Sequence, residues 1–341
     1  MKRTIAFVMV MVLALCAFAG CGNTETPDDS TLKAACILGV GGLGDQGFND
    51  LVYAGMERAK AELGVDFDYA EPKQISDFEQ IMRDMSASGD YIVIVCVGFD
   101  QMDALSIVAP DYPEQNFAFI DGALEGDNIV SYSCREQEGS FLVGAMAALM
   151  KQDAAAYGLA DNNKIGFVGA MEIDTIVRFG AGYAAGAKYV NPDIEVDVQY
   201  VSGDNPFGDT TTAKEIALSQ YNKGSDVIYH AAGGSGLGIF TAAQESDFLA
   251  IGCNSNQNFI DPDHIAASML KRVDTAAFEI VKAASEGNLQ VGKEVVLGLA
   301  QGGIGYTLEG SNIAISEEII EKLTELEQKI ISGEIEVPAA F

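Results

Sequence analysis

Short apolar runs alternate with amphipathic segments along most of the chain. An amphipathic segment from Asn49 to Leu63 follows the apolar run "AACILGV", and another, "SDFEQIMRDMSASG", precedes the run "YIVIVCVG". The pattern restarts after "AAAYGLADNN", where we predict helices over 174–189, 211–222 and 237–245 between further apolar runs. A repeated strand–helix unit is typical of parallel sheets that helices cover on both faces. The pattern therefore predicts an α/β fold of doubly wound parallel sheets.

The N-terminus has a different pattern. Lys2 and Arg3 precede the apolar run "TIAFVMVMVLALCAFAG", which ends just before Cys21. This order predicts a secretory signal peptide over 1–20, whereas a transmembrane anchor would need about 20 apolar residues. The "AGC" at its end resembles a bacterial lipobox, which makes Cys21 the predicted lipidation site and 21–32 a lipid-anchored flexible tether. We therefore expect an extracytoplasmic protein anchored to the bacterial cell membrane through Cys21.

The chain is strongly acidic, with 50 Asp and Glu against 20 Lys and Arg and a formal net charge of −30. This excess repels nucleic acid and anionic lipid headgroups, so we expect neither as a partner and contact with the membrane only through the lipid anchor. His230 and His264 are the only histidines, and the cysteines form no C-x-x-C pair, so catalytic triads and metal clusters lack their usual residues. We therefore predict no enzymatic activity, no metal and no cofactor.

The stretch "GVGGLG" is the motif that favours an enzyme. Gly39, Gly41 and Gly44 match the dinucleotide-binding pattern G-x-G-x-x-G after a predicted strand. A lone match has little specificity in a chain with 37 glycines, and free nicotinamide dinucleotides are not dependably available outside the cell. A dinucleotide oxidoreductase or a nucleoside hydrolase is therefore kept only as an alternative hypothesis.

The loops after the predicted strands carry the chemical information. The folded body of about 310 residues is long for one core and suggests two domains, with ligands bound beyond the carboxyl ends of the strands. The loops expected there include "GDQGFND", "GFDQMDA", "SGDNPFGD" and "AAGGSGLG", which are rich in Gly, Asp, Asn and Phe and almost free of Lys and Arg. No G-K-[ST] phosphate cradle occurs. These loops favour a neutral, hydroxyl-bearing, aromatic ligand.

Several long segments resemble a known family. In chain order they are "GDQGFNDLVYAGMERAKAELG", "EQEGSFLVGAMAALM", "KIGFVGAMEIDTIVRFGAGYAAGAKYVNPDIEV" and "DNPFGDTTTAKEIA". Together they are similar to the basic membrane protein family of substrate-binding lipoproteins, which includes the purine nucleoside receptors. The resemblance implies a type I periplasmic-binding-protein fold that delivers its ligand to an ABC transporter permease. One cleft per chain would make a monomer sufficient.

The resemblance also implies how the chain divides between two doubly wound domains. Three crossovers are expected near residues 134–138, 253–256 and 286–294. The N-terminal domain then comprises 33–134 and 256–285, and the C-terminal domain comprises 138–253 and 294–341.

The polar ligand contacts are expected in the cleft loops. The family's first-loop Asp and Asn fall on Asp45 and Asn49, although Asn49 also suits the N-cap of the following helix. Asp121 would accept a hydrogen bond from a purine N–H, or would instead cap the turn before the next glycine. The backbone amides of the glycine pair in "AAGGSG", Gly233 and Gly234, would add donors.

Phenylalanine rings are expected to hold the base. Phe48 and Phe207 match the aromatic pair that sandwiches a purine in the family, and such stacking is worth about 1–3 kcal/mol per base. Both could instead pack inward as loop residues. Phe179 is a third candidate, which could belong to the buried face of its own helix.

The expected ribose site departs from the family pattern. The family has a carboxylate in a "V-D-S-D-Q"-like segment, whereas this chain has "IGCNSNQ", with Asn254 at the expected Asp, and it retains the downstream Lys271. An amide lacks the charge-assisted bond of a carboxylate, and an unpaired ammonium in a closed cleft is costly. Either another acid compensates or the ligand is not an ordinary ribonucleoside. Our main hypothesis is therefore capture of inosine, guanosine or adenosine, and the alternative is the same fold importing or sensing a modified nucleoside or a sugar-like signal.

Overall fold

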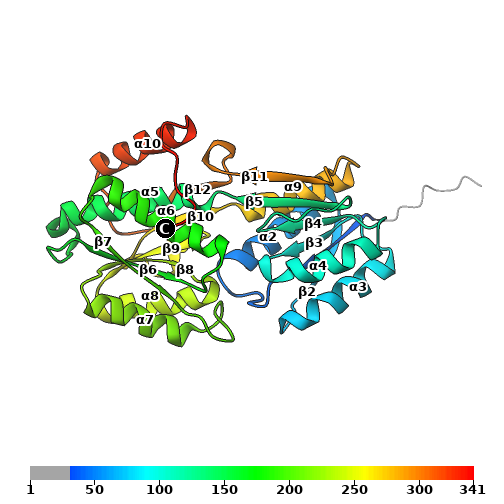
Figure 1. Ribbon diagram of the computed structural model, residues 1–341, viewed down its shortest axis with the longest axis horizontal. Coiled ribbons are helices and arrows are strands. Elements are labelled where there is room, and N and C mark those ends of the chain that lie inside the picture. Colours follow the sequence, from blue (N-terminus) through cyan, green and yellow to red (C-terminus); the bar gives the residue numbers. More distant parts are fainter. Residues whose placement is uncertain (1–30) are drawn as a thin grey trace, which may run out of the picture. The chain divides into compact units, whose positions relative to one another are not determined.

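Two six-stranded sheets form the frame of the described part of the chain, residues 31–341, in a computed structural model (Figure 1). The predicted signal peptide, Cys21 and most of the predicted tether lie outside the described residues. Within residues 31–341, no helix is both long enough and apolar enough to span a membrane.

All neighbouring strands of the first sheet are parallel, in the order β11-β5-β4-β3-β1-β2. The second sheet has the order β12-β10-β9-β8-β6-β7 and is parallel except for β12, which is antiparallel to β10. The strands of the first sheet are β1 (Lys33–Ile37), β2 (Asp66–Ala70), β3 (Ile94–Val97), β4 (Phe117–Ile120), β5 (Ile129–Cys134) and β11 (Lys293–Leu297). Those of the second are β6 (Lys164–Gly169), β7 (Glu195–Tyr200), β8 (Val227–Ala231), β9 (Leu249–Asn254), β10 (Ile265–Lys271) and β12 (Ile304–Thr307).

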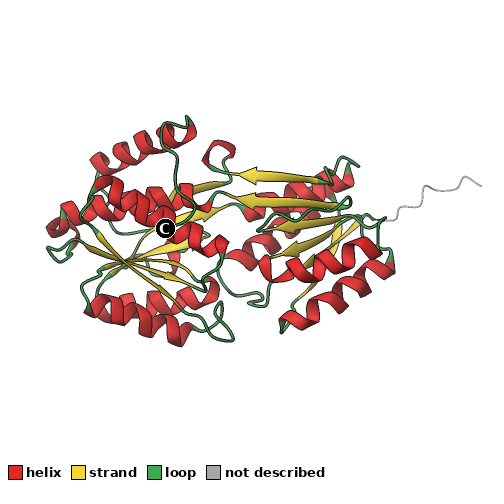
Figure 2. Ribbon diagram, viewed as in Figure 1, coloured by secondary structure: helices red, strands yellow, loops and turns green. Residues whose placement is uncertain are grey.

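Helices cover both faces of the first sheet (Figure 2). Successive residues of a strand point to opposite faces. Accordingly, Ala34 and Cys36 of β1 pack on one face with α2 and α9, and Ala35 and Ile37 pack on the other with α3 and α4. This two-sided burial explains why the strand reads as an uninterrupted apolar run. The helices are α2 (Phe48–Leu63), α3 (Phe78–Ser88), α4 (Met102–Val108) and α9 (Val273–Ser285).

The second sheet has the same construction. One face packs against α5, α6 and α10, and the other packs against α7 and α8. The predicted helices over 174–189, 211–222 and 237–245 correspond to α6, α7 and α8 and differ from them by no more than one residue at either end. We call each sheet with its helices a lobe. The helices of this lobe are α5 (Glu136–Gln152), α6 (Asp174–Val190), α7 (Thr210–Asn222), α8 (Gly236–Ser246) and α10 (Glu317–Ile331).

The chain passes between the lobes at positions that partly differ from the expected ones. β5 ends at Cys134 in the first sheet and α5 begins at Glu136 in the second lobe, near the first expected crossover. The second crossover, expected at 253–256, is corrected because β10 pairs with β9 and β12, so the chain returns only after Lys271. The third, expected at 286–294, is also corrected because β11 pairs with β5, so the chain crosses between β11 and β12.

Two polar loops explain these differences. The segment after β9, "SNQNFIDPDH", has the composition of a linker but leads back into the same sheet, where the buried β10 pairs beside β9. The Gly-containing segment after α9 likewise leads into β11 of the first lobe. β10 therefore belongs to the second sheet and β11 to the first. Residues 32–341 form one compact unit, so their division into two domains stays a prediction.

Candidate functional site

A cavity of about 490 Å³ lies between the lobes, at the carboxyl ends of their parallel strands. The loops after β1, β2, β3 and β4 and the start of α2 line it from the first lobe. From the second lobe it is lined by α6, the loops after β6, β7 and β8, and the ends of β9 and β10. Ligands bind at this position in parallel α/β sheets. The cavity lining includes every residue predicted to bind ligand, namely Asp45, Phe48, Asn49, Asp121, Phe179, Phe207, Gly233, Gly234, Asn254 and Lys271. Their contact with a ligand stays a prediction.

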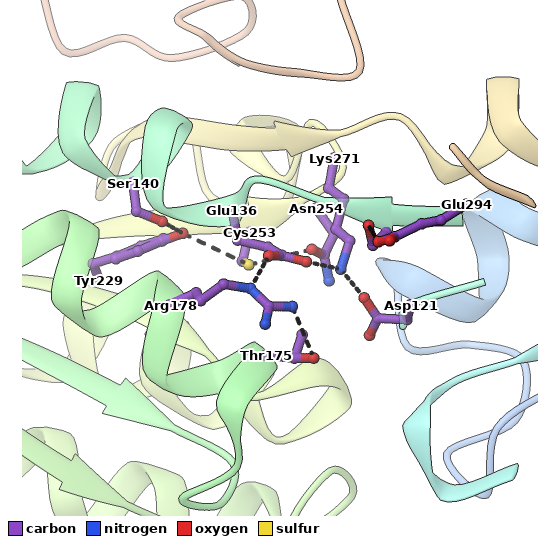
Figure 3. Close-up of polar contacts among 11 residues, drawn as sticks. Asp121, Glu136, Ser140, Thr175, Arg178, Tyr229, Cys253, Asn254, Lys271 and Glu294 are labelled. Atoms are coloured by element: carbon purple, nitrogen blue, oxygen red, sulfur yellow. Dashed lines mark hydrogen bonds and ion pairs between the residues drawn. The ribbon is translucent and has the colours of Figure 1, made fainter. Parts of the chain in front are cut away.

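Lys271 is the buried cation of this cavity (Figure 3). Its Nζ donates to Asp121 Oδ1 across the lobes and, at 2.8 Å, to Glu136 Oε1 at the start of α5. Glu136 Oε2 accepts from Arg178 Nε of α6 at 2.7 Å. Burial alone would lower the pKa of Lys271, but Asp121 and Glu136 raise it above its usual value. Lys271 is therefore charged, and Asp121 and Glu136 supply the carboxylate partners that Asn254 does not.

Glu136 is the acid that the sequence prediction missed. It is fully buried, and burial would raise its pKa, yet Lys271 and Arg178 hold that pKa below its usual range. It stands at the N-terminus of α5, where a carboxylate is also favoured by the helix dipole. The sequence signal was present, since Glu136 lies two residues after the end of β5, but its segment "EQEGSFLVGAMAALM" was used only as part of the family resemblance.

Asp121 is committed to Lys271 in this structure. It follows β4 with a φ of 94°, in the region that non-glycine residues rarely adopt. Its carboxylate accepts from Lys271 rather than from the N–H groups of the following turn. Asn254 at the end of β9 also has a positive φ, 67°, and its Oδ1 accepts from Cys253 Sγ at 3.5 Å. Backbone strain of this kind is typical of ligand-binding sites.

Asp45 and Asn49 organise the first loop. The Asp45 carboxylate accepts from the backbone N–H groups of Gly47 and Asn49, both at 2.9 Å. Asn49 donates from Nδ2 to Asp45 at 3.2 Å, and its Oδ1 accepts from Gly39 N at 2.9 Å. The N-cap position of α2 is Gly47, so the interpretation of Asn49 as the N-cap is wrong, and Asp45 supplies the acceptor at this helix start. Burial raises the pKa of Asp45 despite these donors.

The aromatic side chains come from both lobes. Phe48 at the start of α2 and Phe207 before α7 are half-buried, and each also packs on the core of its lobe. Phe179 is buried in the core of the second lobe but still lines the cavity. Lys271 Nζ lies 5.4 Å from the ring centre of Phe48 and 5.5 Å from that of Phe179. Cationic and aromatic surface thus meet at one wall of the cavity.

Gly233 and Gly234 form the first residues of a short 3-10 turn before α8. The N–H groups at the start of such a turn have no partner inside it. A Cβ on Gly233 would lie 3.2 Å from Phe207 Cδ1, so this glycine lets the ring pack against the turn. A Cβ on Gly234 would lie 3.7 Å from Asp45 Cβ, which shows how closely the lobes approach here.

The loop after β3 contributes residues that the sequence prediction did not select. Phe99 and Asp100 line the cavity, and the ring centre of Phe99 lies 6.4 Å from that of Phe207 in the other lobe. Burial raises the pKa of Asp100 to about 6. The segment "GFDQMDA" was recognised as a cleft loop, and its position after a buried strand was the available signal for both residues.

Groups suited to catalysis or metal binding are scarce in residues 31–341. His230 is buried and hydrogen-bonded to Gln257, and burial lowers its pKa to about 4. Neither it nor His264 lines the cavity. The cysteines of this part of the chain are buried and unpaired, and no group of three or more potential metal ligands gathers there. The arrangement suits binding of an uncharged polar molecule.

Comparison with known proteins agrees with this geometry. Residues 32–340 match the family described as ABC transporter substrate-binding protein PnrA-like. The chain is 30% identical to the ABC transporter nucleoside-binding protein BmpA of Lactococcus lactis over 99% of both chains. It is 35% identical to an uncharacterized lipoprotein of Pyrococcus abyssi over 89% of this chain and 77% of that one.

A solved structure supports the same assignment. The ABC transporter system solute-binding protein of Aeropyrum pernix K1 superposes with a TM-score of 0.82 at 34% identity, covering 90% of this chain and 94% of that one. The expected type I periplasmic-binding-protein fold is thereby confirmed. The chain belongs to the family of PnrA-like ABC transporter substrate-binding proteins, which bind small molecules for an ABC permease and are not enzymes.

Proposed function

We propose that this protein captures a purine nucleoside, with inosine, guanosine and adenosine as candidates, and presents it to its ABC permease. The observation that carries the proposal is the cavity of about 490 Å³ between the lobes. Phe48 and Phe207 line it from opposite lobes, and Lys271 with its hydrogen-bonded partner Asp121 supplies polar groups. Small-molecule sites have volumes of about 300–1,000 Å³ and combine apolar walls with few polar groups. The name of the Lactococcus lactis relative, a nucleoside-binding protein, supports the same ligand class.

The aromatic and the polar side chains that line the cavity suit the two parts of a nucleoside. Phe48 and Phe207 offer ring faces to the base, at about 1–3 kcal/mol per base. Asn254, Asp121 and Lys271 offer donors and acceptors to the ribose hydroxyls. Because two carboxylates already neutralise Lys271, these polar groups require no charge on the ligand. A micromolar dissociation constant corresponds to a binding free energy of about 8 kcal/mol. These contacts can supply it even after subtraction of the entropy lost when the ligand and the side chains become ordered.

Binding couples to closure of the lobes. Ser255 Oγ and Gln257 Nε2 of the second lobe donate to Gln46 O of the first, at 2.5 and 3.2 Å. A ligand that contacts both lobes favours such a closed arrangement only through contacts that an open one lacks. The closed form is the one expected to dock on the permease.

The site of action is the outer side of the cytoplasmic membrane, reached through the signal peptide over 1–20 and lipidation of Cys21. The positive, apolar and small-residue pattern of the N-terminus supports this localisation. The lipoprotein name of the Pyrococcus abyssi relative supports it as well. A monomer is sufficient, because one chain supplies the residues on both walls of the cavity.

Phe48→Ala and Phe207→Ala test the stacking model. Each is expected to weaken nucleoside binding by about 5- to 150-fold, because each removes a stacking face worth about 1–3 kcal/mol. Isothermal titration of refolded, ligand-stripped protein against inosine, guanosine, adenosine, cytidine and ribose is the measurement. Phe259→Ala is the matched control, because Phe259 is 62% exposed and does not line the cavity. Unchanged affinity in both cavity variants would contradict the model.

A second function keeps the fold and changes the ligand. Asn254 stands where the resemblance implies a ribose-binding carboxylate, which favours a modified nucleoside or a sugar-like signal. If the wild-type protein binds none of the tested nucleosides but does bind such a molecule, this alternative is the correct one.

A further inference from the structure

Asp100 differs from Asp45 and Asp121, the other sheltered carboxylates of the cavity, in having no strong partner; Asp204 also lines the cavity but is exposed. Asp45 is held by backbone N–H groups and Asp121 by Lys271. The hydrogen bond that the Asp100 carboxylate accepts is long, 3.4 Å from Val40 N, and within residues 31–341 no cationic side chain forms an ion pair with it. A carboxylate in a sheltered cavity without such partners retains free acceptor positions.

Two glycines lie close to this carboxylate, and one of them leaves the room that it occupies. A Cβ on Gly98 would lie 2.7 Å from Asp100 Oδ1 and 4.0 Å from Phe48 Cε1. A Cβ on Gly39 would lie 3.9 Å from Asp100 Oδ1 and 3.5 Å from Asn49 Oδ1. The distance from Gly98 is too short for a real side chain, so the Asp100 carboxylate lies beside the Phe48 ring only because residue 98 is a glycine, whereas the distances from Gly39 are ordinary contacts. An aromatic ligand stacked on Phe48 would present an edge to Asp100.

The purines differ in what that edge offers. Guanine has two adjacent donors, N1–H and the N2 amino group, which match the two oxygens of one carboxylate. Hypoxanthine retains only N1–H, and adenine has the acceptor N1 beside its amino group. An ionised carboxylate only accepts hydrogen bonds, and paired bonds to a charged group are the stronger ones. At neutral pH, above its pKa of about 6, the Asp100 carboxylate is mostly ionised.

We infer that Asp100 is a specificity-determining residue, whose carboxylate accepts N1–H and the N2 amino group of guanine and so favours guanosine over inosine and inosine over adenosine. This inference rests on the proposed binding of purine nucleosides. In this arrangement Asp100 contacts the edge of the base, and Asp121 remains in its ion pair with Lys271.

Asp100→Asn tests the assignment, because the amide keeps an acceptor for Val40 N but loses the charge and one acceptor. Guanosine affinity is expected to fall by about tenfold or more, since hydrogen bonds to charged groups contribute about 1.5–3 kcal/mol. Adenosine affinity should change by less than about threefold. Titration calorimetry at neutral pH with guanosine, inosine and adenosine is the measurement. The control is Asp103→Asn, because Asp103 is exposed on α4 and does not line the cavity.

The wild-type protein provides a test that does not depend on folding of the variant. 1-Methylguanosine lacks the N1–H donor and should bind about tenfold or more weakly than guanosine. Equal losses for the three nucleosides in Asp100→Asn would overturn the inference and give Asp100 only the role of holding the loop at Val40. Unchanged affinities would overturn it as well. Failure of the wild-type protein to bind any purine nucleoside would instead overturn the proposed function, and this inference with it.

Discussion

At the residue scale, the ion pairs around Lys271 join distant parts of the chain at the cavity, whose lining contains the predicted ligand-binding residues and also Phe99 and Asp100, which were not predicted. All predicted ligand-binding residues line one cavity because strand order brings the loops at the carboxyl ends together. Partners separated by long stretches of chain were not predictable: Lys271 meets Glu136, 135 residues away, and Asp121, 150 residues away. Whether Asp100 has a cationic partner also depends on residues far from it in the sequence, so its lack of such a partner was not predictable.

Lys271→Met is expected to lower the free energy of unfolding by about 3–5 kcal/mol, because it leaves Asp121 without its cation and Glu136 with only one, in a buried site. Urea denaturation of the ligand-free protein measures this loss. Lys322→Met removes the cation of an exposed pair with Glu325 and should cost less than about 1 kcal/mol. A loss for Lys271→Met no larger than that of Lys322→Met would show that the buried network does not stabilise the fold.

At the element scale, periodicity predicted the helices well because it reflects burial of one face. α6, α7 and α8 agree with their predicted ranges to within one residue. The order of the later strands was less predictable, because a polar loop has the same composition whether it leads to the next strand of a sheet or to the other lobe. β10 and β11 were therefore assigned to the wrong lobes, and only their pairing partners, β9 and β5, decide the matter.

The packing of α5 on α6 depends on glycine contacts that no periodicity predicts. A Cβ on Gly186 would lie 1.9 Å from Phe141 O, and one on Gly144 would lie 2.1 Å from Tyr183 O. The two helix backbones therefore touch, and Arg178 of α6 is held beside Glu136 of α5 at the cavity. Close packing of these helices thus positions the acid that pairs with Lys271.

Gly186→Ala is expected to lower the free energy of unfolding by about 1–3 kcal/mol, the usual cost of forcing an atom into a close-packed core. The same substitution at Gly305, where a Cβ would meet no atom within 4 Å, is the matched control and should be nearly neutral. Thermal and urea unfolding of both variants measures the difference. Equal stability of the two would mean that α5 and α6 separate without cost.

At the scale of the whole molecule, charge separates the candidate ligands. The full chain carries a formal charge of −30. Among the described residues that line the cavity, the cations are Lys73, exposed at the rim, and Lys271, which two carboxylates neutralise. Asp45, Asp100, Asp121 and Asp204 also line it. The molecule and its cavity are therefore both unfavourable for an anion.

A nucleoside 5′-monophosphate is accordingly expected to bind at least about 100-fold more weakly than its parent nucleoside, a difference of about 2.7 kcal/mol. Competition titration of whichever nucleoside binds best against its monophosphate measures the ratio. Raising the ionic strength screens the long-range repulsion. It should therefore lower the ratio of the dissociation constant of the monophosphate to that of the nucleoside, while leaving the affinity for the neutral nucleoside almost unchanged. Comparable affinities for the two molecules would mean that the cavity supplies a phosphate site. Lys73 would then be its cation, because the other cation among the described lining residues, Lys271, is already paired with two buried carboxylates. The ligand class would then have to be reassigned, with the contacts at the rim of the cavity considered first.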